Sequence, residues 1–184
     1  MTKNVLLVFA LLLTGAFSAT AQTDRGRVMA GGSVNFNLPT GDGDNIRQSS
    51  LSAAPSIGFF VADNVALGFG VPISVSRYED TGARSVRRNS SFAFAPFGRY
   101  YFGSANIKPF LEARFGIQRF KDYSSVPGRV SESTDNALFV GMGGGIAFFL
   151  NEHVALEPKL TYDAYSRNNT SSAFNFNLGF QVYF

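Results

Sequence analysis

Few residues of this chain have side chains that could carry out chemistry. It contains one histidine, His153, and no cysteine. An imidazole that activates a serine hydroxyl is one basis of hydrolysis, and paired carboxylates such as Glu112, Glu157 and Asp163 could act as general acid and base. The lack of cysteine excludes a disulfide scaffold and a cysteine metal cluster. Residues 41–44 resemble part of a calcium loop but lack its remaining ligands, so we predict no metal site.

A second group of residues could bind anions. Arg77, Arg84, Arg87 and Arg88 lie close together in the sequence, and a guanidinium suits bidentate contact with phosphate. The alternative is a solvated segment balanced by neighbouring acidic residues. The formal net charge is only +3 and no long basic run occurs, which argues against a nucleic-acid partner.

The N-terminal segment has the features of a secretory signal peptide. Lys3 precedes the apolar stretch 5–17, and Ala19-Thr20-Ala21 is a small-residue cleavage site. We therefore expect residues 1–21 to be removed and residues 22–184 to form a single domain. No later segment supplies the roughly 18 consecutive apolar residues of a spanning helix.

The remaining chain alternates between apolar and small or polar residues with a period of two, which is typical of strands with two different faces. Tight links at 63–64, 103–106 and 151–153 alternate with longer polar links at 39–50, 78–90, 121–135 and 166–171. This order predicts an up-and-down antiparallel barrel with both ends of the domain on the tight-turn side. The eight predicted strands are residues 27–38, 51–62, 65–77, 91–102, 107–120, 136–150, 154–165 and 173–184. Bulges or shortened strands are expected near Pro55, Pro72 and Pro96.

The contents of the two faces decide which one is outside. Most phenylalanines share one face, whereas glycine, serine and asparagine collect on the other. An eight-stranded barrel has a narrow interior, so the large apolar residues must face outward, as in a transmembrane barrel. Arg77 and Arg119 are the charged residues on the apolar face, both near long links. The small-residue face carries a predicted lumen charge network of Arg99, Lys108, Glu112, Arg114, Glu157, Lys159 and Asp163.

These features together resemble the small outer-membrane β-barrels of the OmpX/OmpA-like family of Gram-negative bacteria. The resemblance rests on the similar turn segments 59–67 and 148–156, the blocks 99–102 and 109–112, and the alternating C-terminal strand. It implies tight turns in the periplasm, long links outside the cell, and outer-membrane lipid and lipopolysaccharide as partners of a monomer. The final Phe180, Val182 and Phe184 resemble the signal that the barrel-assembly machinery reads. Arg77, Arg84, Arg87 and Arg88 then become candidates for lipopolysaccharide contact.

Three functions follow for such a barrel. We expect a non-catalytic structural or surface-interaction role, with no catalytic residue and no cofactor. Some related barrels modify lipid A, but that chemistry needs an imidazole near the outer leaflet, and His153 belongs to a predicted periplasmic turn. Other relatives conduct small hydrophobic molecules. The inward Phe97, Phe110, Phe120, Phe139 and Phe149 could line such a path or simply fill the core.

Overall fold

The computed structural model of the protein describes residues 23–37, 46–103, 106–166 and 170–184. The predicted signal peptide and residues 41–44 lie outside the described residues. In the described part of the chain, no helix is long and apolar enough to cross a membrane. The strands are β1 (Val28–Asn37), β2 (Ile46–Ala62), β3 (Val65–Gly70), β4 (Ile73–Asp80), β5 (Ser85–Tyr101), β6 (Ile107–Val126), β7 (Arg129–Phe149), β8 (Val154–Ser166) and β9 (Thr170–Tyr183).

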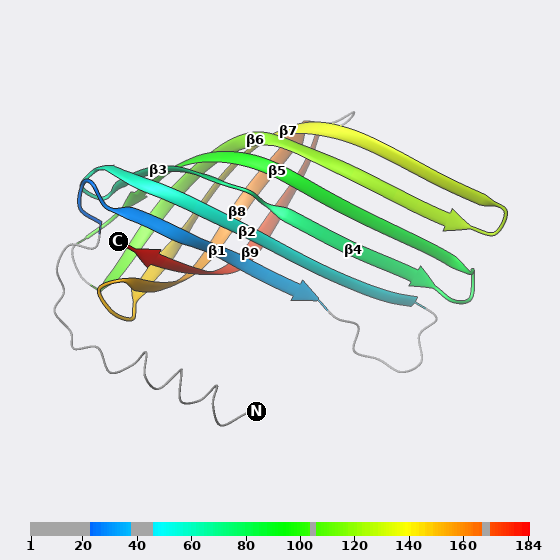
Figure 1. Ribbon diagram of the computed structural model, residues 1–184, viewed down its shortest axis with the longest axis horizontal. Coiled ribbons are helices and arrows are strands. Elements are labelled where there is room, and N and C mark those ends of the chain that lie inside the picture. Colours follow the sequence, from blue (N-terminus) through cyan, green and yellow to red (C-terminus); the bar gives the residue numbers. More distant parts are fainter. Residues whose placement is uncertain (1–22, 38–45, 104–105, 167–169) are drawn as a thin grey trace, which may run out of the picture.

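The strands close into one antiparallel ring (Figure 1). β3 and β4 both pair with β2 on one side and β5 on the other, so they are consecutive halves of a single strand. β1 pairs with both β2 and β9, which closes the ring between the two ends of the domain. The predicted eight-stranded up-and-down barrel is therefore confirmed, with its third strand interrupted.

The three prolines at which irregular strands were expected affect the ring differently. Pro72 lies in the gap between β3 and β4, as expected for a residue that cannot donate to a ladder. At Pro96 the pairing between β5 and β6 is interrupted between Phe94 and Phe97, and the register is the same on both sides. Pro55 stays within β2 opposite Gly32, so the strand is not shortened there, although its pairing on the other side is interrupted between Ala53 and Ser56.

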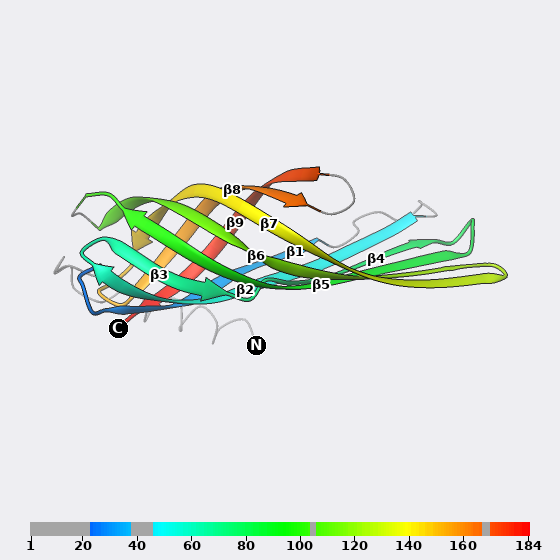
Figure 2. The ribbon, with the colours of Figure 1, turned by 90° about the horizontal axis from the view of Figure 1, so that it is seen from above.

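Several strands are longer than the alternation predicts. The predicted loops 78–90 and 121–135 are mostly strand, because β4 to β7 continue as two hairpins beyond the body of the barrel (Figures 1 and 2). The second hairpin closes with Val126 opposite Arg129, and Gly128 supplies the positive φ of its turn. β2 likewise begins at Ile46, inside the predicted loop 39–50. We call these extensions, with the start of β2, the protruding sheet.

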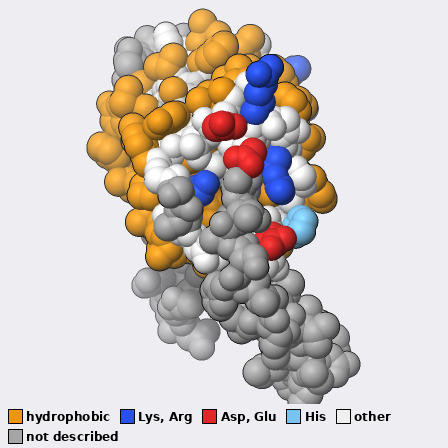
Figure 3. Space-filling model, turned by 90° about the vertical axis from the view of Figure 1, so that its left-hand side faces the viewer, with side chains coloured by type: hydrophobic (Ala, Val, Ile, Leu, Met, Phe, Trp, Pro, Cys, Tyr) orange, Lys and Arg blue, Asp and Glu red, His pale blue; other side chains and the backbone are white. Residues whose placement is uncertain are grey.

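The two faces of the ring differ as predicted. Large exposed hydrophobic side chains point outward from every part of the barrel, among them Phe36, Leu111, Val140 and Phe176. Charged and small residues point inward, and Figure 3 shows charged side chains gathered inside a hydrophobic rim at one end of the molecule. The outward apolar belt ends at Val75, Phe92 and Ile117, where the protruding sheet begins.

Candidate functional site in the barrel lumen

A buried ionic cluster crosses the lumen near the tight-turn end. The guanidinium of Arg99 on β5 donates to the carboxylate of Glu157 at 2.7 Å and, through Nε, to Glu112 at 3.0 Å. Lys159 Nζ lies 3.2 Å from the other oxygen of Glu112. Arg99 is 3% exposed and Glu157 is 1% exposed. Two cations and two carboxylates therefore balance one another at one level of the barrel, as buried charges require.

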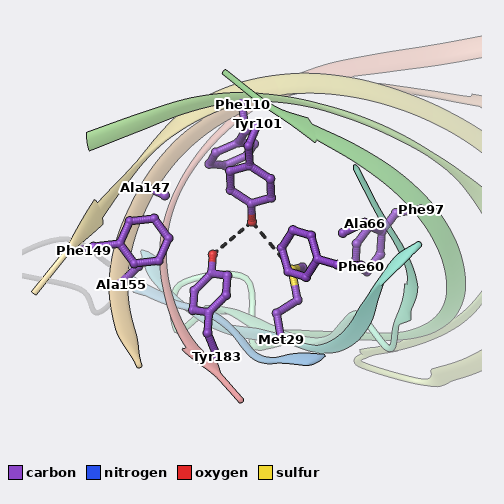
Figure 4. Close-up of a cluster of buried hydrophobic side chains, with 10 residues drawn as sticks. All are labelled: Met29, Phe60, Ala66, Phe97, Tyr101, Phe110, Ala147, Phe149, Ala155 and Tyr183. Atoms are coloured by element: carbon purple, nitrogen blue, oxygen red, sulfur yellow. Dashed lines mark hydrogen bonds between the residues drawn. The ribbon is translucent and has the colours of Figure 1, made fainter. Parts of the chain in front are cut away.

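Aromatic residues complete this level of the lumen (Figure 4). The Tyr101 hydroxyl accepts a 2.9 Å bond from Arg99, and the Tyr183 hydroxyl donates to Glu157 at 2.7 Å. The two hydroxyls lie 3.0 Å apart, and the ring of Phe110 lies 4.3 Å from the Arg99 guanidinium carbon. We call these residues, with Phe60 and Met29 beside them, the lumen floor. Neither tyrosine was predicted to belong to the site, although both have the inward parity.

The other predicted network residues separate into two further places. Arg114 pairs with Asp163 at 2.7 Å, and Asn175 donates to the same carboxylate at 3.1 Å. Lys108 instead donates to the hydroxyl of Thr23 at 2.7 Å, where the first described residues lie at the tight-turn end. The seven residues thus all face the lumen, but six of them form two separate ionic groups and Lys108 belongs to neither.

Two cavities lie in the lumen beside these ionic groups, one next to the Arg99 cluster and one next to the Arg114–Asp163 pair. The smaller, of about 30 Å³, touches both Arg99 and Gln181, whose buried amide oxygen has no partner among the described residues. A polar cavity of this size suits one water molecule. The larger cavity, of about 290 Å³, lies toward the protruding sheet, and its lining combines serine, asparagine and glutamine side chains with apolar residues around Arg114 and Asp163. We call it the upper chamber.

The arginines proposed for lipopolysaccharide contact do not form a loop. Arg77 on β4 and Arg88 on β5 are direct cross-strand neighbours on the outward face. Arg84 lies in the turn of that hairpin with a positive φ, and Arg87 takes the opposite face, across from Tyr78. Exposed Arg119 and Lys121 on β6 join Arg77 and Arg88 just above the apolar belt. These four residues form what we call the basic row.

The remaining candidate residues are dispersed. His153 is an exposed turn residue at the tight-turn end. Phe97, Phe110 and Phe149 pack in the core at the lumen floor, whereas Phe139 packs with Tyr165 beside the upper chamber and Phe120 also contacts Tyr165. Among the described residues, no three histidine, aspartate or glutamate side chains are grouped to hold a metal. Phe180 on β9 and Phe184 directly after it are exposed.

Comparison with known proteins places this geometry among membrane barrels. A family model described as "Outer membrane protein beta-barrel domain" matches residues 7–184. No curated protein sequence matches the chain significantly. Three solved structures illustrate the similarity in fold. A major outer membrane protein from Thermus thermophilus has a TM-score of 0.58 at 10% identity, over 86% of this chain and 99% of that one. Ail, the attachment invasion locus protein of Yersinia pestis, has a TM-score of 0.57 at 10% identity, over 87% and 99% of the two chains. The N-terminal barrel domain of Pseudomonas aeruginosa OprF has a TM-score of 0.51 at 15% identity, over 88% and 98%.

Proposed function

The chain belongs to the outer membrane protein β-barrel domain family, and we propose that it is a non-catalytic surface protein whose basic row binds the phosphates of lipopolysaccharide. It is an outer-membrane protein, so its apolar belt lies in lipid. The proposal rests on one observation, which is that Arg77, Arg88, Arg119 and Lys121 share the outward face directly above the belt. Lipid phosphates lie at this depth, just outside the hydrocarbon.

The charge arrangement of the basic row favours an anionic partner. Arg77 and Arg88 are directly opposite each other, and like charges in that position destabilise a sheet. Glu79 lies 3.0 Å from Arg77, but the pair is exposed and neutralises only one cation of the four. A bound phosphate would relieve the repulsion through charge-assisted hydrogen bonds. Each cation near an anionic membrane surface contributes about 1 kcal/mol of binding free energy.

The protruding sheet also offers a strand edge, but its charges argue against strand addition. In the described part of the chain, pairing between β7 and β8 begins at Leu138 and Ser166, so residues 129–137 of β7 have no strand on that side. This edge carries Arg129, Glu132 and Asp135. Charged residues on an exposed edge discourage pairing with another chain. We therefore favour contact with lipopolysaccharide over capture of an extended peptide.

The packing of the lumen supports a closed barrel. Arg99, Tyr101, Tyr183 and the residues around them pack across the tight-turn half of the lumen, and the cavity beside Gln181 measures only about 30 Å³. A conduit for hydrophobic molecules is less well supported, because three of its five candidate phenylalanines pack into this floor. Ring closure pairs the strands around the belt, which supports a monomer. Outward Phe180, Val182 and Phe184 remain our proposed signal for the barrel-assembly machinery.

The proposal is tested by binding to lipopolysaccharide in detergent-solubilised or vesicle-reconstituted protein. Arg77→Gln/Arg88→Gln should weaken binding about 30-fold, at about 1 kcal/mol for each lost charge. The matched control is Arg84→Gln/Arg87→Gln, which removes two arginines of the same hairpin from outside the basic row. Equal loss in both variants would contradict the proposal, as would unchanged binding of wild-type protein to dephosphorylated lipopolysaccharide.

A further inference from the structure

We propose that the upper chamber binds a neutral sugar unit that enters from the side of the protruding sheet. The chamber is independent of the basic row and faces the lumen instead of lipid. Its wall draws on every strand of the ring, and its volume is about 290 Å³. That is the space of about ten water molecules, and it can hold a pyranose with about twelve non-hydrogen atoms.

The polar lining of the chamber is neutral and rich in groups that both donate and accept. Ser52, Ser74 and Ser91 form a row across β2, β4 and β5, because Ser52 pairs with Ser74 and Ser74 with Ser91. Asn175 and Asn177 face this row from β9. Hydroxyl and amide groups match sugar hydroxyls, each of which also donates and accepts.

The charges in the chamber cancel, which argues against an ionic ligand. Arg114 donates to both oxygens of Asp163, through Nε at 3.0 Å and Nη2 at 2.7 Å. These two residues are the only ionised side chains lining the chamber among the described residues. A free anion would have to compete with Asp163 for Arg114, and a cation with Arg114 for Asp163. A neutral polar molecule meets neither penalty.

Part of the lining is held in place while another part has unused hydrogen-bonding capacity. The Ser74 and Ser91 hydroxyls lie 2.7 Å apart, and the Gln118 amide donates to Ser91 at 2.8 Å, which fixes one wall. On the other side, no described side chain bonds to the Asn177 amide or to the Ser33 hydroxyl. A site with ordered groups and available partners loses little entropy on binding.

An aromatic surface completes the chamber. Phe139 and Tyr165 both line it, with ring centroids 5.8 Å apart and planes tilted by 34°. A sugar ring has an apolar C–H face between polar edges, so it fits a cavity with aromatic rings and hydroxyls on different walls. Arg114 points into the lumen and keeps 16% exposure of its side chain, so the chamber leaves space for solvent at this depth.

The test uses side-chain amide resonances of labelled protein in phosphocholine micelles, because detergents with sugar head groups would compete. Methyl glucoside, methyl galactoside and N-acetylglucosamine are the monosaccharide probes. At least one should shift the amides of Asn175, Asn177 and Gln118 saturably, with a Kd on the order of 1 mM for so small a ligand. If none of the three produces saturable shifts at these amides, the chamber holds only solvent and the proposal is overturned.

Two variants separate binding in the chamber from binding elsewhere. Ser52→Leu fills the chamber from β2 and should weaken binding at least tenfold, whereas Ser49→Leu makes the same change on the outward face of the same strand and should not. If Ser52→Leu does not fold, sugar affinity is measured in Asn177→Leu, which fills the chamber from β9. Unchanged sugar affinity in a folded chamber variant would overturn the proposal.

The source of the sugar is decided by a longer probe. Maltotriose should bind at least as well as methyl glucoside if the chamber takes the terminal unit of a surface glycan, and more weakly if it takes a free monosaccharide. Either result supports the site. Because this assay contains no lipopolysaccharide, its failure would leave the proposed role of the basic row unaffected.

Discussion

Replacing Arg99 with methionine should destabilise the folded barrel by about 4 kcal/mol. Arg99→Met keeps an apolar stem of similar length but removes the donors to Glu112, Glu157 and Tyr101. Breaking a buried ion pair by removing one partner costs about 3–5 kcal/mol, since the other charge stays buried without compensation. Lys159 still faces Glu112, so Glu157 is the carboxylate that loses its ionic partner.

The same reasoning predicts that a second substitution repairs part of the damage. Glu157→Gln removes the stranded charge but leaves an acceptor for the Tyr183 hydroxyl, which lies 2.7 Å from the carboxylate. Arg99→Met/Glu157→Gln should therefore be more stable than Arg99→Met alone by about 2 kcal/mol, a coupling typical of residues in one network. Arg119→Met is the control, because this exposed arginine on the outward face should cost no more than about 0.5 kcal/mol.

The stability of these variants is best followed by gel mobility. The chain contains no tryptophan, so unfolding lacks that fluorescence signal. A folded membrane barrel should migrate differently from its boiled form, and the folded fraction across a urea series gives the free energy of unfolding. The reasoning is refuted if Arg99→Met costs less than about 1 kcal/mol, or if the double variant is less stable than the single one.

Two further predictions concern a lumen glycine and the last strand. Gly141→Ala should lower the free energy of unfolding by about 1–3 kcal/mol, because a Cβ there would collide with Asp163. In the same urea series Gly98→Ala should be nearly neutral, since its nearest neighbour is Leu67 at 3.4 Å, and equal costs at the two glycines would contradict the reasoning. Phe184→Ser should reduce the amount of assembled barrel in cells while changing stability in vitro by less than about 1 kcal/mol, because the side chain is 65% exposed. Unchanged assembly in cells would remove Phe184 from the proposed signal.

The faces of the strands were predictable because lipid and lumen impose opposite requirements on alternate residues. That contrast disappears once a strand leaves the membrane. In the protruding sheet water reaches both faces, so polar residues such as Ser124 and Ser125 occupy successive positions and look like a loop. The hairpins at 78–90 and 121–135 were therefore misassigned, even though the barrel itself was not.

The inward face of the lumen charges was predictable, but their division into separate groups and their pairing were not. Parity tells which face a residue takes and says nothing about its height in a tilted barrel. Lys108 and Glu112 share the inward face of β6, yet four residues of strand separate them by roughly 13 Å. Lys108 thus meets Thr23 near the tight-turn end, while Glu112 meets Arg99. The register between strands, which sets these heights, is a property of the closed ring.

The two halves of the lumen differ in packing. The lumen floor is densely packed, whereas the upper chamber leaves a cavity, so substitutions in the two places should affect different properties. At the floor, large side chains meet glycines across neighbouring strands. A Cβ on Gly145 would approach Phe110 to 2.7 Å, so the fit leaves no room for substitution. Higher up, serines from three adjacent strands leave a space that solvent can occupy at little cost. Changes at the floor should therefore appear mainly as altered unfolding free energy, whereas changes of the chamber side chains outside the Arg114–Asp163 pair should appear mainly as altered sugar binding.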